Sequence, residues 1–327
     1  MFKATLNLAA VMLALVTSVT NAFASDPPAQ SVEKLRALLS SIDPYLPKEA
    51  VSGKLVVYGS GSMDGLMHAW AENFTDFHSK ASFEISGLPE DKATAKLLAE
   101  PSTIWMVSRP ISSDELAQLK AKGLKNPVAL EVAKEALGVF VHQTNPVKTI
   151  TGEQLRNTFT AQNPEAPTWK LLGATGTWAD KPINLIRRGE DSGTQKFLTN
   201  VLFATKMRPG QDVESNSAVV AKIKDDPQSI GICGLRCGST TARPLQLKSG
   251  DTTIPSDDLA ILSGKYPLVR PMSIVFDLGS ANKNTNEFVH YILSQSGQSE
   301  TVLAGLFPID LPLLRAELQT INAPQKR

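Results

Sequence analysis

A pattern of strand, loop and helix that occurs twice constrains the fold of this chain most strongly. In the first copy, the apolar run over residues 54–58 enters a glycine- and serine-rich loop, and apolar residues then recur at helical spacing from Leu66. In the second copy, residues 183–186 lead through a polar loop into another apolar helical pattern that begins near Phe197. Strands that alternate with helices along a chain predict an α/β architecture.

The loop of the second copy carries residues suited to binding an anion. Arg187 and Arg188 come shortly before the triplet Ser192-Gly193-Thr194, which stands where the helix is expected to begin. Backbone N–H groups at a helix N-terminus favour an anion, glycine lets the backbone come close, and an arginine can bind two oxygens at once. This chemistry indicates a tetrahedral oxyanion that is held without catalysis. The alternative is an ordinary N-cap beside solvated arginines.

The first residues of the chain predict export. Lys3 precedes an apolar run over residues 6–19, and Ala22-Phe23-Ala24 has the small-x-small pattern of a signal-peptide cleavage site. The run is short for a membrane span. We expect a signal peptide over residues 1–24 that is cleaved after Ala24, with a retained N-terminal anchor as the alternative.

Composition argues against several kinds of function. The 33 basic and 32 acidic residues leave a net charge of +1, and without a basic block the chain is not expected to bind nucleic acid. The four histidines, of which we expect His68 and His78 at the surface or boundary of a helix, show neither metal-site nor nucleophile-elbow spacing. We therefore expect no cofactor, no metal and no enzyme; a secreted serine hydrolase whose residues meet only in three dimensions is the enzymatic alternative.

The two cysteines, Cys233 and Cys237, leave two states open. In an oxidising compartment they could pair. An extended strand would hold their Cα atoms too far apart for a bridge, so pairing requires the chain to turn at Gly234. A disulfide and two free thiols both remain possible, whereas a metal site is not favoured because no histidine or further cysteine lies nearby in sequence.

Several segments, taken in order, resemble the phosphate-binding proteins of bacterial ABC importers. No single motif is decisive, and the specificity comes from their order and spacing between about Val56 and Pro308. The segments are residues 58–67, Ser108-Arg109-Pro110-Ile111, and residues 136–147, 151–159, 178–194, 219–231 and 266–268.

The resemblance implies an α/β, two-lobed periplasmic-binding-protein-like fold with two crossover strands and a ligand cleft between the lobes. After the signal peptide, an N-terminal extension with an accessory helix would cover residues 25–52. The first lobe would comprise residues 53–136 and, with the C-terminal helices, residues 269–327. The second lobe would comprise residues 137–268.

The same resemblance implies a periplasmic, monomeric substrate-binding protein that captures an oxyanion, phosphate in the first place, for the membrane permease of an ABC importer. The first lobe would offer a helix start and a guanidinium, and the second lobe a guanidinium, hydroxyls and backbone donors. The residues implied are Ser62, Met63, Asp64 and Arg109 in the first lobe, and Arg188, Ser192, Gly193 and Thr194 in the second.

Two departures from the family bear on the ligand. After the second strand the family has hydroxyl residues, where this chain has Glu90, Asp91 and Lys92. Carboxylates beside an anion weaken its binding unless they point away or pair with Lys92 or Arg109. Met63 also stands where the family commonly has a hydroxyl. A sensor or interaction module with an altered or lost ligand is therefore the alternative function.

Overall fold

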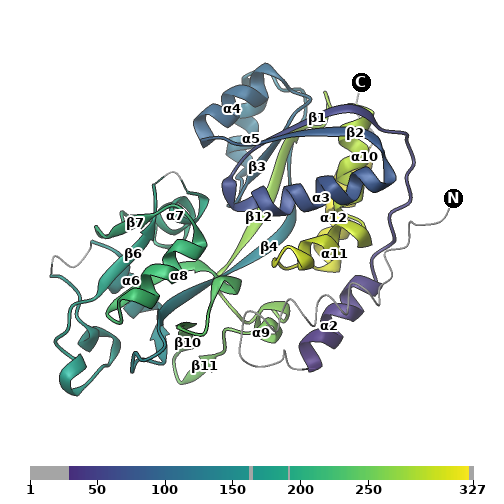
Figure 1. Ribbon diagram of the computed structural model, residues 1–327. Helices are drawn as coiled ribbons and strands as arrows, with labels where there is room; N and C mark the ends of the chain where they lie inside the picture. Colours follow the sequence, from purple (N-terminus) through teal and green to yellow (C-terminus); the bar gives the residue numbers. More distant parts are fainter. Residues whose placement is uncertain (1–28, 162–164, 191, 324–327) are drawn as a thin grey trace. The chain divides into compact units, whose positions relative to one another are not determined.

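The computed structural model describes residues 29–161, 165–190 and 192–323 (Figure 1). These residues form two units: unit 1 comprises Glu33–Lys134 and residues 270–323, and unit 2 comprises residues 29–32 and Glu135–Val269. Strands β4 (Pro127–His142) and β12 (Val269–Asp277) contain the points at which the chain passes between the units. The expected signal peptide lies outside the described residues. Among the residues that the structure describes, no helix has the length and apolar character of a membrane span.

The sheet of unit 1 has the strand order β2-β1-β3-β12. Strands β1 (Ser52–Gly59), β2 (Lys80–Gly87) and β3 (Ile104–Val107) are parallel, and β12 runs antiparallel to β3. All four residues of β3 are buried, as is typical of a parallel strand that is covered on both faces. The α/β architecture expected from the sequence is confirmed.

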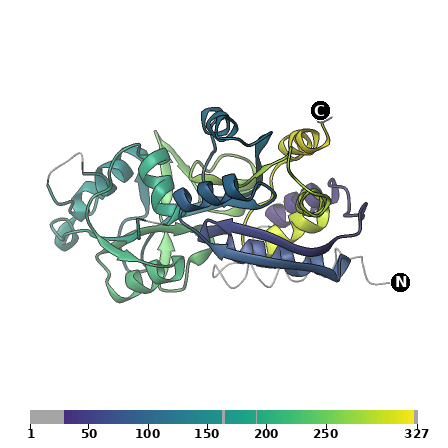
Figure 2. The same ribbon diagram turned by 90° about the horizontal axis from the view of Figure 1, so that it is seen from above.

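Helices cover both faces of this sheet (Figures 1 and 2). Tyr58 of β1 packs with Leu97 and Leu119 of two helices on one face. On the other, the Phe74 ring contacts those of Phe288 and Tyr291. The helices of unit 1 are α2 (Ala29–Ser40, from Glu33 on), α3 (Asp64–Phe77), α4 (Glu90–Ala99), α5 (Ser113–Ala121), α10 (Lys283–Ile292), α11 (Gln295–Leu303) and α12 (Leu311–Asn322).

A buried chain of hydrogen bonds anchors the segment that joins α2 to β1. The Tyr45 hydroxyl donates to Glu287 Oε1 and lies 2.7 Å from His78 Nε2, while the Val51 N–H donates to His78 Nδ1. His78 is only 6% exposed, so the expectation of a surface or boundary position was wrong. The aromatic cluster that encloses its ring explains the difference. Burial lowers the pKa of His78, which favours the neutral ring that this network requires.

The main sheet of unit 2 has the strand order β4-β8-β6-β7, and β9 also pairs with β4. Strand β6 is parallel to both β7 and β8, whereas β4 is antiparallel to β8. A separate small sheet has the order β11-β10-β5. The strands are β5 (Thr149–Thr151), β6 (Asn184–Arg188), β7 (Gln211–Val213), β8 (Ser229–Gly234), β9 (Ala242–Pro244), β10 (Gln246–Ser249) and β11 (Thr252–Ile254).

The helices of unit 2 are short, and local side chains define where they begin. Thr151 and Gln154 form a capping box at the first, and the Ser215 hydroxyl accepts a hydrogen bond from the Ala218 N–H at another. Helix α7 continues directly into a π-helical turn, Leu198–Leu202. The α-helices are α6 (Gly152–Phe159), α7 (Gly193–Phe197), α8 (Asn216–Asp225) and α9 (Asp258–Leu262), and 3-10 turns cover Trp169–Leu172, Gly176–Trp178 and Leu235–Cys237.

Candidate functional site

Parallel strands bring the predicted residues of each unit to one edge of its sheet. In unit 1, β1, β2 and β3 all end at the same edge, and the segments that follow them lead to Ser62, Glu90 and Arg109. In unit 2, β6, β7 and β8 end in loops that lead to Ser192 and Asn216. The carboxyl edge of parallel strands is where ligands commonly bind in α/β proteins.

The loop after β1 depends on Gly59. Its φ angle is +133°, and a Cβ atom there would overlap the carbonyl oxygen of Met106 on the neighbouring strand. The next residue, Ser60, donates its N–H to that same carbonyl at 2.9 Å. Glycine thus allows the chain to leave β1 close against β3.

The family resemblance assigns Ser62, Met63 and Asp64 to the ligand. In the structure their backbone N–H groups form hydrogen bonds within the 3-10 turn Gly61–Met63. The Ser62 N–H donates to Ser60 Oγ at 3.3 Å, the Met63 N–H donates to the Ser60 carbonyl at 3.0 Å, and the Asp64 N–H donates to the Gly61 carbonyl. The Met63 side chain is fully buried and packs in the core. In this conformation the helix start is therefore hydrogen-bonded within its own turn.

Two carboxylates hold Arg109 in place. Its Nε donates to Glu90 Oε1 at 2.8 Å and its Nη2 contacts the same oxygen, while Nη2 and Nη1 contact the two oxygens of Glu115 at 2.6 and 3.1 Å. The Arg109 side chain is 18% exposed. The sequence left open whether the acids after β2 point away from the site or pair with Lys92 or Arg109. Glu90 pairs with Arg109.

Glu90 and Glu115 both belong to first turns of helices, where negative charge is favoured. Glu115 also completes a capping box with Ser112, whose N–H donates to Glu115 Oε2 at 2.9 Å. Burial by itself raises the pKa of Glu115, but the hydrogen bonds from Arg109 and Ser112 outweigh it and lower the pKa below its usual value. Burial also opposes the charge of Arg109, and hydrogen bonds to Glu115 and Glu90 outweigh it and raise the pKa of that guanidinium.

A second guanidinium of unit 1 was not predicted. Arg270, at the start of β12, is fully buried, and its Nη1 lies 3.3 Å from the Ser108 carbonyl and 3.4 Å from Ser108 Oγ. The Ser108 hydroxyl in turn hydrogen-bonds the Ser60 hydroxyl at 2.8 Å. The loops after β1 and β3 are thus joined to β12 through polar side chains, a link between residues far apart in sequence.

In unit 2 the loop after β6 has the N-cap that the sequence offered as the alternative to an anion site. The Ser192 Oγ accepts a hydrogen bond from the Gln195 N–H at 3.0 Å, and the Ser192 N–H donates to the Gly189 carbonyl at 2.9 Å. Helix α7 begins at Gly193, and Thr194 in its first turn is fully buried. The arrangement places the Gly193 and Thr194 backbone at the positive end of a helix.

Neighbouring arginines at the end of β6 have different partners. Arg187 forms an ion pair with Asp212, with a closest contact of 2.7 Å. Arg188 Nη1 donates to Asn216 Oδ1 at 2.6 Å, and its Nη2 donates to the Glu214 carbonyl at 2.8 Å. Successive side chains of a strand point to opposite faces. Arg188 therefore reaches the loop that follows β7, and Asn216 is a contact that sequence spacing did not reveal.

The cysteines lie at the same edge of unit 2. Cys233 is the buried penultimate residue of β8, and Cys237 is partly exposed at the end of the 3-10 turn Leu235–Cys237. Both are free thiols in this structure. A disulfide between the two cysteines was expected to require a turn of the chain at Gly234, and the chain does turn directly after this residue.

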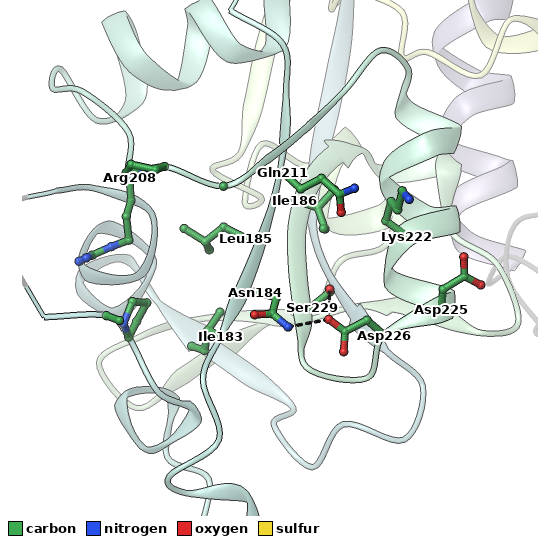
Figure 3. A pocket seen from close by; sticks show the side chains of 14 residues that line it. Ile183, Asn184, Leu185, Ile186, Arg208, Gln211, Lys222, Asp225, Asp226 and Ser229 are labelled. Atoms are coloured by element: carbon green, nitrogen blue, oxygen red, sulfur yellow. Dashed lines mark hydrogen bonds between the residues drawn. The ribbon is translucent and has the colours of Figure 1, made fainter.

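A hollow of about 590 Å³ lies at the opposite end of β6 (Figure 3). Asn184 donates to Asp226 Oδ2 at 2.7 Å there, and Ser229 donates to the same oxygen at 2.8 Å. Burial raises the pKa of Asp226, but hydrogen bonds from Asn184, Gln228 and Ser229 outweigh it and lower the pKa overall. An ionised carboxylate in this hollow disfavours an anion, so it does not belong to the predicted site. Over the described residues, no group of His, Cys, Asp and Glu side chains is arranged to hold a metal ion.

Known proteins match most of the chain. The model of the PBP superfamily domain matches residues 47–296. The phosphate-binding protein PstS of Pseudomonas aeruginosa is 30% identical over 288 residues, which cover 83% of this chain and 89% of that protein. The phosphate-binding protein PstS of Bacillus subtilis is 25% identical over 83% of this chain and 85% of its own length.

Solved structures show the same fold. An ABC-type phosphate transport receptor from Vibrio cholerae superposes with a TM-score of 0.64 at 23% identity, over 78% of this chain and 100% of that chain. PstS from Borrelia burgdorferi superposes with a TM-score of 0.55 at 21% identity, over 79% of this chain and 100% of that chain. At these identities the structural likeness supports the fold alone.

Proposed function

The chain belongs to the PBP superfamily, and from that premise we propose that it is a substrate-binding protein of an ABC importer whose ligand is an oxyanion, phosphate in the first place. Relatives that bear the name phosphate-binding protein match over most of their length. They are binding proteins, which favours a role without catalysis. The observation that carries the proposal is the strand–loop–helix of unit 2, where Arg188 and the start of α7 lie within one short loop.

This loop can bind a tetrahedral anion by two kinds of donor. The Gly193 and Thr194 backbone lies at the N-terminus of α7, where N–H dipoles favour negative charge. The Ser192 hydroxyl, which already accepts from the Gln195 N–H, can still donate to a ligand. Arg188 supplies a planar guanidinium that is oriented by Asn216 and the Glu214 carbonyl. We assign these four residues to the ligand.

The residues of unit 1 are proposed as a weaker part of the ligand set. Ser62, Met63 and Asp64 would have to exchange hydrogen bonds of their turn for bonds to the anion. At Arg109 a ligand would compete with Glu90 and Glu115. The unit 1 residues therefore contribute less to affinity than Arg188 does.

The proposed setting is the periplasm, with cleavage after Ala24, a monomeric mature protein and a membrane permease as partner. These proposals follow from the export pattern of the sequence and from the names of the relatives. N-terminal sequencing of protein recovered from the periplasm tests the first two. A mature N-terminus other than Ser25 would overturn the cleavage site.

Calorimetric titration of the mature protein with phosphate tests the function. We expect saturable binding of one phosphate per chain and competition by arsenate. The absence of heat with both phosphate and arsenate at millimolar concentration, in a sample that unfolds cooperatively, would refute the proposal.

A sensor or interaction module is the second candidate, and one observation favours it. Where the family has hydroxyl donors, Glu90 places a carboxylate against Arg109. This removes donors from unit 1 and adds a charge that opposes an anion. If the folded protein binds no phosphate, a screen of other small anions by thermal shift distinguishes an altered ligand from a lost one.

A further inference from the structure

Another hollow of unit 2, with a volume of about 360 Å³, lies beside helix α7. Its walls come from the end of β6, the loop that follows, α7, the π-helical turn and the chain after that turn. Arg187 lines this hollow, and because successive side chains of a strand point to opposite faces, the hollow lies across β6 from Arg188. The lining of this Gln195 hollow includes Arg187, Glu190, Gln195, Lys196, Lys206 and Met207.

The end of the π-helical turn folds the chain back to form one wall of the hollow. The Thr205 N–H donates to the Thr199 carbonyl at 3.0 Å. Ala204, directly before it, has a φ angle of +49°, the left-handed conformation that ends many helices. The chain therefore turns sharply, and Lys206 and Met207 line the hollow together with residues of α7.

The side chain of Gln195 lacks a hydrogen bond that a buried amide requires. Gln195 is only 5% exposed, and its Oε1 has no hydrogen-bond partner among the described residues. An unpartnered buried acceptor costs about 1–3 kcal/mol, so its presence in a folded protein calls for a physical reason. The backbone N–H of the same residue is already used, since it donates to Ser192 Oγ at 3.0 Å. A ligand in the hollow that carries an N–H donor can satisfy the amide oxygen.

The charged side chains of the lining indicate the other groups of such a ligand. Lys196 and Lys206 supply two ammonium groups, and Glu190 supplies one carboxylate. Arg187 is paired with Asp212 at 2.7 Å. Apart from that pair, the lining carries two positive charges against one negative charge. A ligand with two carboxylates and one ammonium group matches these charges one for one.

We propose that the Gln195 hollow binds a small acidic amino acid, such as glutamate. The two carboxylates of the ligand pair with Lys196 and Lys206. Its ammonium group donates to Gln195 Oε1 and pairs with Glu190, and its methylene groups pack on the buried Met207. The volume of about 360 Å³ falls within the range of roughly 300–1,000 Å³ that is typical of small-molecule sites.

This site differs in chemistry from the proposed oxyanion site and goes beyond it. A phosphate ion offers mainly acceptor oxygens and negative charge, so the Glu190 carboxylate and the Gln195 oxygen disfavour it in this hollow. The same two groups suit an ammonium donor. Phosphate and the amino acid are therefore expected to bind at the same time, on opposite faces of β6.

The first experiment is a calorimetric titration of the full mature protein with L-glutamate, with and without phosphate. We expect one glutamate per chain, with a Kd that neither phosphate nor Arg188→Ala changes. Glutarate lacks the ammonium group and glutamine lacks the second carboxylate, so each should bind about tenfold more weakly or worse. No binding of glutamate at millimolar concentration, equal binding of glutarate, or competition by phosphate would each refute the proposal. If phosphate itself does not bind, the proposed function fails while the outcome for glutamate stands.

The second experiment locates the ligand with variants of the lining. Gln195→Met removes the buried amide, and Lys206→Met removes a charge from an exposed position. Each should weaken glutamate binding about tenfold or more, whereas Lys224→Met, an exposed lysine of α8 outside the hollow, should leave it unchanged. Because Gln195→Met also removes an unpartnered acceptor, its thermal midpoint should not fall. Unchanged affinity in Lys206→Met, or an equal loss in Lys224→Met, would overturn the site even if Gln195→Met does not fold.

Discussion

Arg109 and Arg188 occupy corresponding places in the two units and have different surroundings. Arg109 comes shortly after β3 and Arg188 is the last residue of β6, so both lie at the carboxyl edge of parallel strands. Arg109 contacts the carboxylates of Glu90 and Glu115, and the hydrogen bonds of Arg188 include those to the Asn216 amide oxygen and the Glu214 carbonyl. A carboxylate both orients a guanidinium and offsets its charge, but a carbonyl oxygen only orients it.

On the proposed function, one residue type serves structure in one unit and binding in the other. At Arg109 two acids tie the loop after β3 to the first turns of α4 and α5. Arg188 is the last residue of β6, and the next helix along the chain, α7, begins at Gly193 with a start that favours negative charge. The central claim is that oxyanion affinity depends mainly on Arg188.

Replacing Arg188 has the largest expected effect. Arg188→Ala removes a charge-assisted contact to the anion, so we expect a loss of about 2–3 kcal/mol of binding free energy, roughly 30- to 150-fold in Kd. Calorimetry with phosphate measures it. Arg187→Ala is the matched control, because Arg187 is paired with Asp212, and its effect on affinity should be small. Similar losses for both variants would contradict the assignment.

Asn216→Asp gives Arg188 a carboxylate partner of the kind that Arg109 has. The substitution keeps the shape of the side chain and its oxygen contact at Nη1, but adds a negative charge beside the anion. We expect a loss of about 1–2 kcal/mol, roughly 5- to 30-fold in phosphate affinity. Unchanged or tighter binding would mean that the contact at Asn216 lies outside the site.

Glu90→Gln makes the opposite change in unit 1. Loss of this charge removes one of the two ion pairs of Arg109 and keeps the pair with Glu115, so the guanidinium can contribute more to an anion. We expect phosphate affinity to rise by about 0.5–1 kcal/mol, roughly two- to fivefold. Asp91→Asn changes the same charge on the same helical turn and serves as the control. An equal response of the two variants would show that the Arg109 contact has no specific role.

Lowering the pH should weaken the ion pair between Glu115 and Arg109 in unit 1 by a small amount. The pKa of Glu115 is lowered in the folded protein. Its contribution to stability is therefore complete above the unfolded pKa near 4.5 and is lost as pH falls through the folded value. Thermal unfolding of wild type and Glu115→Gln from neutral to acidic pH measures it, since the difference in midpoint should shrink in acid. A difference that does not change with pH would leave the ionised pair without a stabilising role.

Local patterns in the sequence predicted the helix starts well. The helix start expected at Ser192-Gly193-Thr194 is confirmed, and the Ser192 cap, which was the alternative interpretation of that loop, joins residues three apart. Crossover strands were expected from the family resemblance, and β4 and β12 provide them. The π-helical turn after α7 was not predicted, because its sequence continues the ordinary apolar helical pattern.

The partners of the arginines could not be predicted, because they depend on how distant segments meet. Arg109 and Glu90 are 19 residues apart, Arg188 and Asn216 are 28 apart, and Arg270 and Ser108 are 162 apart. Sequence reasoning could state that Glu90 would either pair with a cation or weaken the site, but not which. It also could not show that the N–H groups of Ser62 and Met63 are used within their own turn.

The ratio of affinity losses for Arg188→Ala and Arg109→Ala tests the central claim most directly. Both variants lose one arginine, and both are titrated with phosphate by calorimetry under identical conditions. We predict that Kd rises at least about tenfold more for Arg188→Ala than for Arg109→Ala, since the anion has to compete with two carboxylates at Arg109. Equal losses, or a larger loss for Arg109→Ala, would contradict the account.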